Sequence, residues 1–589
     1  MGSRRLPGLT ASCLRLQRTA LRRRWTKRLL LSQQQVLQFS CTPSRDNQRV
    51  AVIGGGITGL TTAFNLAQKK APIQVTIYEK SQQLGGWMQS ETIQTDGGKV
   101  VFEYGPRTLR CSQPYDVLPT LELLALIGLE TSLILTSKSA PAALNRYIYY
   151  PDRLVRLPGQ QPGASLPALV SNAMRIASEP LFKGLLWGIL RESFVESRDS
   201  SVRDESIADF VARRFGKEPA DNIASAVFHG IYAGDIDKLS ARTVLPQLWD
   251  CELVDGTGGV LMKTIERNSS GQPPLYPYNK HKALTTIISG YPAEYVKLLP
   301  RLVAGGSVFT LRDGLNSIIT ALTEALSRFP NVRIIRGADI SHIQHDRAKR
   351  SMMLVSANKP AVRYDYVVST TPSKVLAAQL RGPEGRTSPT ATSRLLSTNN
   401  YAVNVMVVNL FFSDPNLVPV EGFGYLIPRT IPIEQNPERA LGVLFMSDAA
   451  AGQDTAEGTK LAVMIGGHWW DGWNRSDFPD EQKGIAMAKA VLARHLGISQ
   501  EPVVAKARML HNAIPQHTVG HNERMEELHE SLSREYDSRL KVAGAWYTGV
   551  GVNDCITSAR VLAASMRQGN HDVTGLENFV LPSKPLETL

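Results

Sequence analysis

The chain has 589 residues and a mass of 64.7 kDa, with 43% hydrophobic and 20% charged residues, a composition typical of a globular protein of roughly two to four domains. Its net charge of +13 is concentrated in residues 1–45, which hold ten Lys or Arg and no Asp or Glu, so that only +3 belongs to the remainder. This distribution argues against a nucleic-acid partner, and no apolar run reaches the roughly 18 to 20 residues that span a bilayer.

The basic tail, residues 1–45, is the first segment with a predicted role. Leu, Ser and Gln separate its arginines, and it lacks a long apolar centre. This composition is typical of a mitochondrial transit peptide rather than a secretory signal. A disordered basic arm has a similar composition and remains the alternative. Folded sequence is expected to begin near Gln48.

Residues 50–79 have the pattern of a strand, a glycine turn, a helix and a second strand. The apolar run VAVI enters GGGITG, a helix-period stretch follows, and a β-branched run ends at Glu79. In the G-x-G-x-x-G motif, Gly54 would permit a sharp turn, Gly56 would let a pyrophosphate approach the backbone, and Gly59 would let helix and strand pack closely. An acid about twenty residues after the last glycine can bind a ribose, so the pattern predicts a dinucleotide-binding unit rather than an unrelated glycine-rich loop.

Two further glycine turns indicate a cofactor larger than a nicotinamide dinucleotide. They lie in LGGWMQS, residues 84–90, and in KVVFEYGPRTLR, residues 99–110, where a predicted strand ends at Gly105. FAD needs an extended slot for its adenine, pyrophosphate, ribityl chain and isoalloxazine. FAD is therefore the predicted cofactor.

Residues 140–245 are predicted to be mainly helical. Within them, short apolar segments are broken by Pro167 and Pro180 and flanked by Lys183 and Arg191. These segments either dip into a bilayer surface or form an ordinary pair of core helices, since both share this periodicity. The apolar residues are Leu166, Leu169, Leu181, Phe182, Leu185, Leu186, Trp187, Ile189 and Leu190.

The rest of the chain returns twice to an α/β pattern. A helix and two strands are predicted between residues 312 and 372, a strand-rich stretch follows, and LKVAGAWYTGVGVNDC supplies a last strand and glycine turn. We therefore predict an FAD-binding domain from residues 48–135, 307–375 and 540–575. A helical domain would comprise residues 140–245, and a substrate domain residues 246–306 and 376–539. The stretch 251–301 is treated as an insertion without an assigned role.

The five cysteines are scattered, without a C-x-x-C pair. An odd number at irregular spacing predicts neither a disulfide framework nor a zinc site, so free thiols and no metal are expected. The cysteines are Cys13, Cys41, Cys111, Cys251 and Cys555.

Ten motifs, in order along the chain, resemble those of the protoporphyrinogen oxidase family within the flavin-containing amine oxidase superfamily. The first is common to many flavoproteins, whereas GPR, HGIYAGD and VND are narrower signals. The resemblance implies an α/β fold with a Rossmann-like FAD-binding domain of the amine oxidase type built from discontinuous segments, a mixed α+β substrate domain and a helical membrane-associating domain. The motifs are GGGITG, LGGWMQS, FEYGPR, NRYIYY, ESIADFVARRFG, HGIYAGDIDKLS, EGFGYLIP, VMIGGHW, IPQHTVGH and GVGVNDC.

The resemblance also implies which residues contact a non-covalently bound FAD. Glu79 would bind the adenosine ribose, Ile340 the adenine, and residues 550–552 would lie beside the isoalloxazine. The implied cofactor residues are Gly54, Gly55, Gly56, Ile57, Thr58, Gly59, Glu79, Trp87, Gly105, Pro106, Arg107, Thr108, Ile340, Val550, Gly551 and Val552.

Fewer residues are implied for the substrate. Arg146 would hold a porphyrinogen propionate; without the resemblance it would be interpreted as a surface arginine. Phe423, Leu426 and Met464 would clasp the macrocycle and Gly230 would approach it closely, although the sequence alone would make all four core residues. His468 and His517 are interpreted as structural.

The implied reaction is the oxygen-dependent, six-electron oxidation of protoporphyrinogen IX to protoporphyrin IX in haem synthesis, with release of hydrogen peroxide. No catalytic side chain is expected, because the flavin N5 would accept the hydride. The resemblance places the protein peripherally on the mitochondrial inner membrane, facing the intermembrane space, near other haem-synthesis enzymes, and allows a homodimer.

Three other functions remain open. A monoamine or polyamine oxidase would need an aromatic cage, and monoamine oxidases attach FAD through a cysteine, whereas Cys555 is expected only to pack. A polyene (carotenoid) desaturase is the second alternative. The third is a non-enzymatic prenyl-GTPase escort protein of related fold, against which the complete glycine motif with Glu79 argues.

Overall fold

The computed structural model describes residues 48–68, 73–111, 114–158, 176, 178–253, 259–269, 299–356, 360–380 and 389–580. All of them belong to one compact unit, residues 48–589. The predicted transit peptide with Cys13 and Cys41, the apolar residues Leu166 and Leu169, and most of the 251–301 insertion lie outside the described residues.

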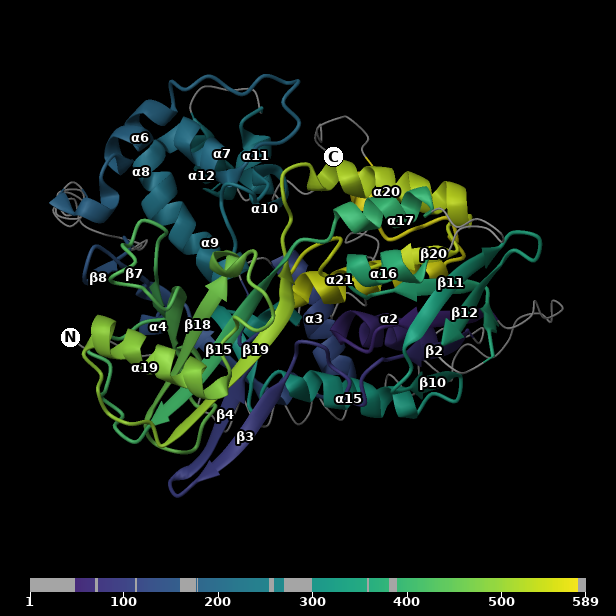
Figure 1. The fold of residues 1–589 in the computed structure, drawn as a ribbon, viewed down its shortest axis with the longest axis horizontal. Helices are drawn as coiled ribbons and strands as arrows, with labels where there is room; N and C mark the ends of the chain where they lie inside the picture. The colour runs from purple at the N-terminus through teal and green to yellow at the C-terminus, as the bar shows by residue number, and fades with distance from the viewer. Residues whose placement is uncertain are drawn as a thin grey trace, which may run out of the picture. The chain divides into compact units, whose positions relative to one another are not determined.

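A five-stranded parallel sheet forms the centre of the first layer (Figure 1), in the order β10-β2-β1-β14-β20. Its strands come from three stretches of chain that are far apart in sequence. Because both faces are covered, the strands are near-continuous apolar runs rather than alternating ones. The strands are β1 (Arg49–Ile53), β2 (Gln74–Tyr78), β10 (Val332–Ile335), β14 (Tyr366–Ser369) and β20 (Leu540–Val542).

Four helices pack together beside this sheet, with α2 at their centre and every residue of α2 buried. A buried apolar cluster joins the sheet to three other helices and to the small antiparallel sheet β11-β12-β13. The first group is α2 (Ile57–Ala67), α3 (Pro114–Leu126), α15 (Asn316–Ser327) and α21 (Val552–Arg567). The second comprises α16 (Ser373–Gln379), α17 (Ala391–Thr398), α20 (His521–Tyr536), β11 (Ile340–Asp346), β12 (Ser351–Ser356) and β13 (Val362–Tyr364).

A seven-stranded sheet, β19-β15-β18-β17-β16-β7-β8, forms the second layer, and α19 (Glu481–Leu496) packs against it (Figure 1). Residues 147–156 were predicted within the helical segment, but they form β7 and β8, because Tyr147 and Ile148 pair with Tyr425 and Leu426 far along the chain. The strands are β7 (Tyr147–Tyr149), β8 (Leu154–Arg156), β15 (Ala402–Phe412), β16 (Gly424–Leu426), β17 (Ala440–Phe445), β18 (Thr459–Gly467) and β19 (Val504–Pro515).

Two small sheets and three short helices complete these layers. The hairpin β3–β4 leads into the GPR segment, and β9 pairs with both β5 and β6. The elements are β3 (Ser90–Thr95), β4 (Gly98–Glu103), β5 (Leu109–Arg110), β6 (Leu133–Ser137), β9 (Gly306–Leu311), α4 (Pro141–Leu144), α18 (Met446–Ala449) and η5 (His468–Trp470).

The helical part of the chain is held by a buried ion network. Glu252 accepts hydrogen bonds from Arg198, Arg213 and Arg214, and Arg214 also contacts Glu192. The network joins α6 (Leu185–Glu192) and α7 (Ile207–Phe215) to Glu252, the residue that follows α11 (Pro246–Cys251). The other helices of this part are α8 (Lys217–Pro219), η3 (Ala220–Ala224), α9 (Ser225–Tyr232), α10 (Ala241–Val244) and α12 (Val260–Ser269).

The apolar residues of the predicted bilayer-facing segment divide into two groups. Leu181 and Phe182 are buried in a core cluster, whereas Trp187 and Leu190 on α6 are 69% and 67% exposed, and Phe194 just beyond it is 86% exposed. None of the helices among the described residues is long and apolar enough to cross a bilayer.

Candidate cofactor and substrate site

The three glycines of the motif between β1 and α2 lie in three different environments. Gly54 adopts φ 105°, in the left-handed region that favours glycine. A Cβ on Gly59 would lie 1.9 Å from the carbonyl oxygen of Gly54, so strand and helix approach each other too closely for a side chain there. A Cβ on Gly56 would meet no atom within 4 Å. The turn therefore leaves open space at Gly56, beside the N-terminus of α2.

Glu79 lies at the end of β2 and faces this turn. Its Oε2 accepts a hydrogen bond of 2.6 Å from the N–H of Gly55, and its Oε1 accepts one of 2.8 Å from the N–H of Ser81. The carbonyl oxygen of Glu79 also accepts from the N–H of Ala338, which tethers the chain that leads to Ile340. The predicted ribose and adenine residues are thus brought to the same edge of the sheet.

The second glycine segment lies directly against the first. Gly85 donates from its N–H to the carbonyl oxygen of Gly55 at 2.9 Å. A Cβ on Gly105 would lie 1.8 Å from the carbonyl oxygen of Trp87, so this close approach requires glycine. Trp87 is 44% exposed. The segments 54–59, 85–87 and 105–108 therefore border one site, with Ile57 and Thr58 buried in the first turn of α2.

Arg107 carries buried donors without partners. Its Nη1 lies 3.6 Å from the sulfur of Met464, while Nε and Nη2 are shielded from solvent and have no hydrogen-bond acceptor among the described residues. Burial lowers the pKa of Arg107 to about 10, against the opposing charge of Glu103. Unpaired buried donors are costly, so this guanidinium indicates a missing acceptor group at the site.

The last predicted cofactor segment, residues 550–552, leads into α21. Gly551 is the N-cap of this helix, and the side chain of Asn553 ties it to Thr120 and to the carbonyl oxygen of Arg110. Cys555 is buried on the same helix, and burial raises the pKa of its thiol to about 12. A neutral thiol is a poor nucleophile, and whether Cys555 only packs stays a prediction.

Arg146 lies between α4 and β7. Its guanidinium carbon is 5.9 Å from the ring centroid of Phe423 and has no carboxylate partner among the described residues. Burial and the neighbouring charge of Arg110 lower the pKa of Arg146. Two neighbouring arginines without a carboxylate partner among the described residues indicate a place for an anionic group.

Leu426 and Met464 lie in one row across the seven-stranded sheet. Leu426 is paired with Gly442, and Gly442 with Met464, so a strand glycine separates the two apolar side chains. A Cβ on Gly230 of α9 would lie 2.6 Å from Cδ2 of Leu426. Sequence reasoning missed Gly442, although a glycine within a strand pattern is a known sign of close approach.

Two histidine pairs lie near these elements. His229 donates from Nδ1 to the carbonyl oxygen of Ile427 and pairs through Nε2 with Nε2 of His468 at 2.8 Å. His517 and His521 stack with ring centroids 4.1 Å apart, each bonded to a backbone carbonyl. Burial lowers the pKa of His468 and of His517 to about 4, so both pairs are neutral structural contacts at neutral pH.

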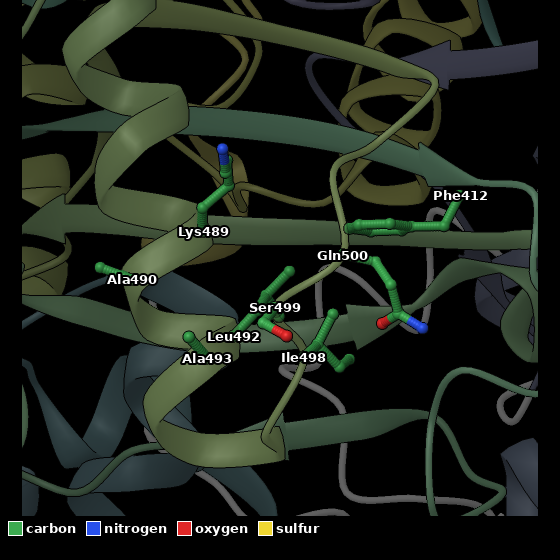
Figure 2. A pocket seen from close by; sticks show the side chains of 8 residues that line it. All are labelled: Phe412, Lys489, Ala490, Leu492, Ala493, Ile498, Ser499 and Gln500. Atoms are coloured by element: carbon green, nitrogen blue, oxygen red, sulfur yellow. The ribbon is translucent and has the colours of Figure 1, made fainter.

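Two surface pockets border other parts of the unit. Figure 2 shows the first, beside α19, where Lys489, Leu492 and Phe412 surround an opening that contains none of the predicted site residues. The second is lined by Ile340, the predicted adenine contact, and by Gln379 of α16. Among the described residues, no group of three His, Cys, Asp or Glu side chains could hold a metal ion.

The sequence matches the flavin containing amine oxidoreductase family over residues 57–566. It is 33% identical to the protoporphyrinogen oxidase of Schizosaccharomyces pombe, covering 88% of this chain and 100% of the relative. The chain belongs to the protoporphyrinogen oxidases of this flavin-dependent family. The human protoporphyrinogen oxidase is 30% identical, covering 88% of this chain and 98% of the relative.

Two solved structures share the fold. Cyclohexylamine oxidase from Brevibacterium oxydans matches with a TM-score of 0.55 and 14% identity, covering 89% of this chain and 99% of the other. A protein of Exiguobacterium sp. 255-15 matches with a TM-score of 0.63 and 20% identity, covering 89% and 100%. The predicted fold class and the flavin cofactor are confirmed, whereas the domain boundaries and the individual site residues remain predictions.

The residues present fit a flavin dinucleotide. Open space at Gly56 beside a helix N-terminus suits a pyrophosphate, and the unpaired nitrogens of Arg107 suit an acceptor-rich ring system.

Proposed function

We propose that the protein binds FAD without a covalent bond and oxidises protoporphyrinogen IX to protoporphyrin IX in haem biosynthesis, with O2 as the electron acceptor. The observation that carries the proposal is the contact between Arg107 and Met464. It joins the segment predicted for the cofactor to the strand predicted for the substrate, in a member of the protoporphyrinogen oxidases.

The proposed roles of the side chains are binding and exclusion of water. Arg146 binds a propionate of the substrate through a charge-assisted hydrogen bond. Phe423, Leu426 and Met464 supply apolar contacts to the macrocycle, and Gly230 and Gly442 allow the side chain of Leu426 to pack closely against α9 and β17. Bound FAD would supply the redox chemistry, taking two electrons at each of three oxidations and passing them to O2 to give hydrogen peroxide.

The burial of Cys555 supports non-covalent binding of FAD. Cys555 is 6% exposed, and burial raises the pKa of its thiol, which disfavours attack on a flavin methyl group. Denaturing the purified protein should release all of its flavin into the supernatant. Flavin that remains with the precipitated protein would contradict this part of the proposal.

We also propose that the protein is imported through residues 1–45 and lies peripherally on the mitochondrial inner membrane, facing the intermembrane space near other haem-synthesis enzymes. Support comes from the exposed side chains of Trp187, Leu190 and Phe194, with Lys183 and Arg191 beside them. Replacing the three apolar residues with serine should reduce sedimentation with anionic vesicles. Unchanged sedimentation would remove this surface from the proposal.

The reaction is tested with the flavin-loaded full-length protein and anaerobically prepared protoporphyrinogen IX. Air is admitted, and porphyrin fluorescence is followed against a control without enzyme. A rate well above autoxidation, with about three peroxides per porphyrin from the balance of three two-electron oxidations, supports the proposal. Flavin-loaded protein that gives no rate above the control contradicts it, and coproporphyrinogen III and amines are then the substrates to compare.

A further inference from the structure

A pocket lies at the end of β2, beside Glu79. Lys80, which directly follows Glu79, lines it, as do Ile340 of β11 and four residues of α16. Figure 1 shows α16 and β11 as neighbours, and the two elements pack against each other. A parallel bridge between Ile343 and Leu380 fixes the end of α16 to β11.

Gln379 is the buried polar residue of this pocket. It is 5% exposed, and its Nε2 donates to the carbonyl oxygen of Ile340 at 2.8 Å. This bond fixes the orientation of the carboxamide. Its other end, Oε1, has no hydrogen-bond donor among the described residues. A buried amide oxygen without a donor is costly, so the side chain is set to accept a hydrogen bond from something that the pocket receives.

The position of Glu79 indicates what that ligand is. In a dinucleotide-binding fold, the acid at the end of the second strand holds the adenosine ribose, while the pyrophosphate lies at the helix N-terminus. The base therefore extends from Glu79 away from the glycine turn, which is where Lys80 and Ile340 line the pocket. Val375 and Ala378 expose an apolar stretch of α16 to the same space, a suitable wall for a flat ring.

We propose that the carboxamide oxygen of Gln379 accepts a hydrogen bond from the 6-amino group of the adenine ring and selects for an adenine-containing dinucleotide. This inference rests on the proposed binding of FAD. Hypoxanthine carries a carbonyl oxygen in place of the amino group. In its dinucleotide, that oxygen would face the carboxamide oxygen of Gln379, and neither atom could donate a hydrogen. A site built to accept from an N–H group discriminates against a ligand that lacks it.

The test compares FAD with its deaminated analogue, in which hypoxanthine replaces adenine. Flavin is removed from the full-length protein, and each nucleotide is titrated back while quenching of flavin fluorescence is recorded. The wild-type protein should bind FAD about tenfold more tightly than the analogue, the effect of one hydrogen bond with a buried partner. Gln379→Met should weaken FAD binding and remove the preference.

Gln500→Met is the matched control, because it makes the same substitution in the unrelated pocket beside α19. It should leave both dissociation constants unchanged. Equal affinity of the wild-type protein for the two nucleotides, or an unchanged preference in folded Gln379→Met, would overturn the inference while FAD binding stands. If the wild-type protein binds neither nucleotide, the proposed cofactor itself fails. Should Gln379→Met not fold, the ratio of the two wild-type affinities still decides.

Discussion

Nη1 of Arg107 lies 3.6 Å from the sulfur of Met464, and this contact is the only hydrogen bond of the Arg107 guanidinium among the described residues. A thioether is a weak acceptor for a charged donor. The site therefore contains a buried cation whose main partner must come from a ligand. The unpaired donors therefore lower the stability of the flavin-free protein and raise its affinity for the flavin.

Arg107→Met tests both effects. Removing the unpaired nitrogens should stabilise the flavin-free protein by about 1 kcal/mol, the cost of burying unsatisfied donors. The same substitution should weaken flavin binding, because the ligand loses its donor. Chemical denaturation of the flavin-free protein and a flavin titration measure the two effects. A variant that is less stable when empty and binds flavin normally would show that Arg107 is a structural residue.

Arg146→Met should affect the substrate alone. We expect KM for protoporphyrinogen IX to rise about tenfold or more, because a charge-assisted hydrogen bond contributes about 1.5–3 kcal/mol. Bound flavin and its absorption spectrum should not change. Arg153→Met is the control, since Arg153 is an exposed arginine that pairs with Glu179. Steady-state kinetics that are identical for both variants would exclude Arg146 from the substrate site.

Local patterns in the sequence predicted the glycine turn correctly, because the φ angle of Gly54 and the packing at Gly59 depend on residues within one βαβ unit. Relationships across long separations were not predictable in this way. Residues 147–156 were assigned to a helical segment because nothing local shows that Tyr147 pairs with Tyr425. The role of Gln379 likewise depends on α16 packing against β11.

The segment predicted to face a bilayer shows the limit of periodicity. Phe182 is buried and Trp187 exposed, although both belong to short apolar runs of the same kind. Apolar spacing predicts that a face will be covered, but not whether protein or lipid covers it. Phe182 is buried because it belongs to η2 (Pro180–Phe182), which packs against residues of β7 and β8.

Gly230→Ala should reduce substrate affinity through Leu426. The new methyl group would meet Cδ2 of Leu426 at 2.6 Å and push that side chain toward the row containing Met464. We expect a higher KM with normal flavin content. Adding Leu426→Ala should restore part of the affinity by making room, so the double variant should bind substrate better than Gly230→Ala alone. Additive losses in this cycle would contradict the proposed contact.

Glu252→Gln should strongly destabilise the helical part of the chain. Burial alone would raise the pKa of Glu252, but hydrogen bonds from Arg213 and Arg198 and the charge of Arg214 outweigh it and lower the pKa to about 2. Removing this charge leaves buried arginines without their shared partner, which costs about 3–5 kcal/mol. Glu501→Gln, which breaks an exposed pair with Lys489, should cost less than about 1 kcal/mol. Urea unfolding compares the two, and equal small losses would contradict the role of the network.

The buried histidines predict a loss of stability in mild acid. Burial lowers the pKa of His517 to about 4, whereas an unfolded histidine titrates near 6.5. Between these values the unfolded chain binds more protons, so the free energy of unfolding falls as the pH decreases from about 6.5 to 4 and is fully retained above 6.5. His517 alone would account for about 3 kcal/mol over this interval. His517→Asn, whose amide can still donate to the carbonyl oxygen of Ala545, should flatten that slope by one proton. Parallel pH profiles for the two proteins would show that His517 does not titrate in this interval.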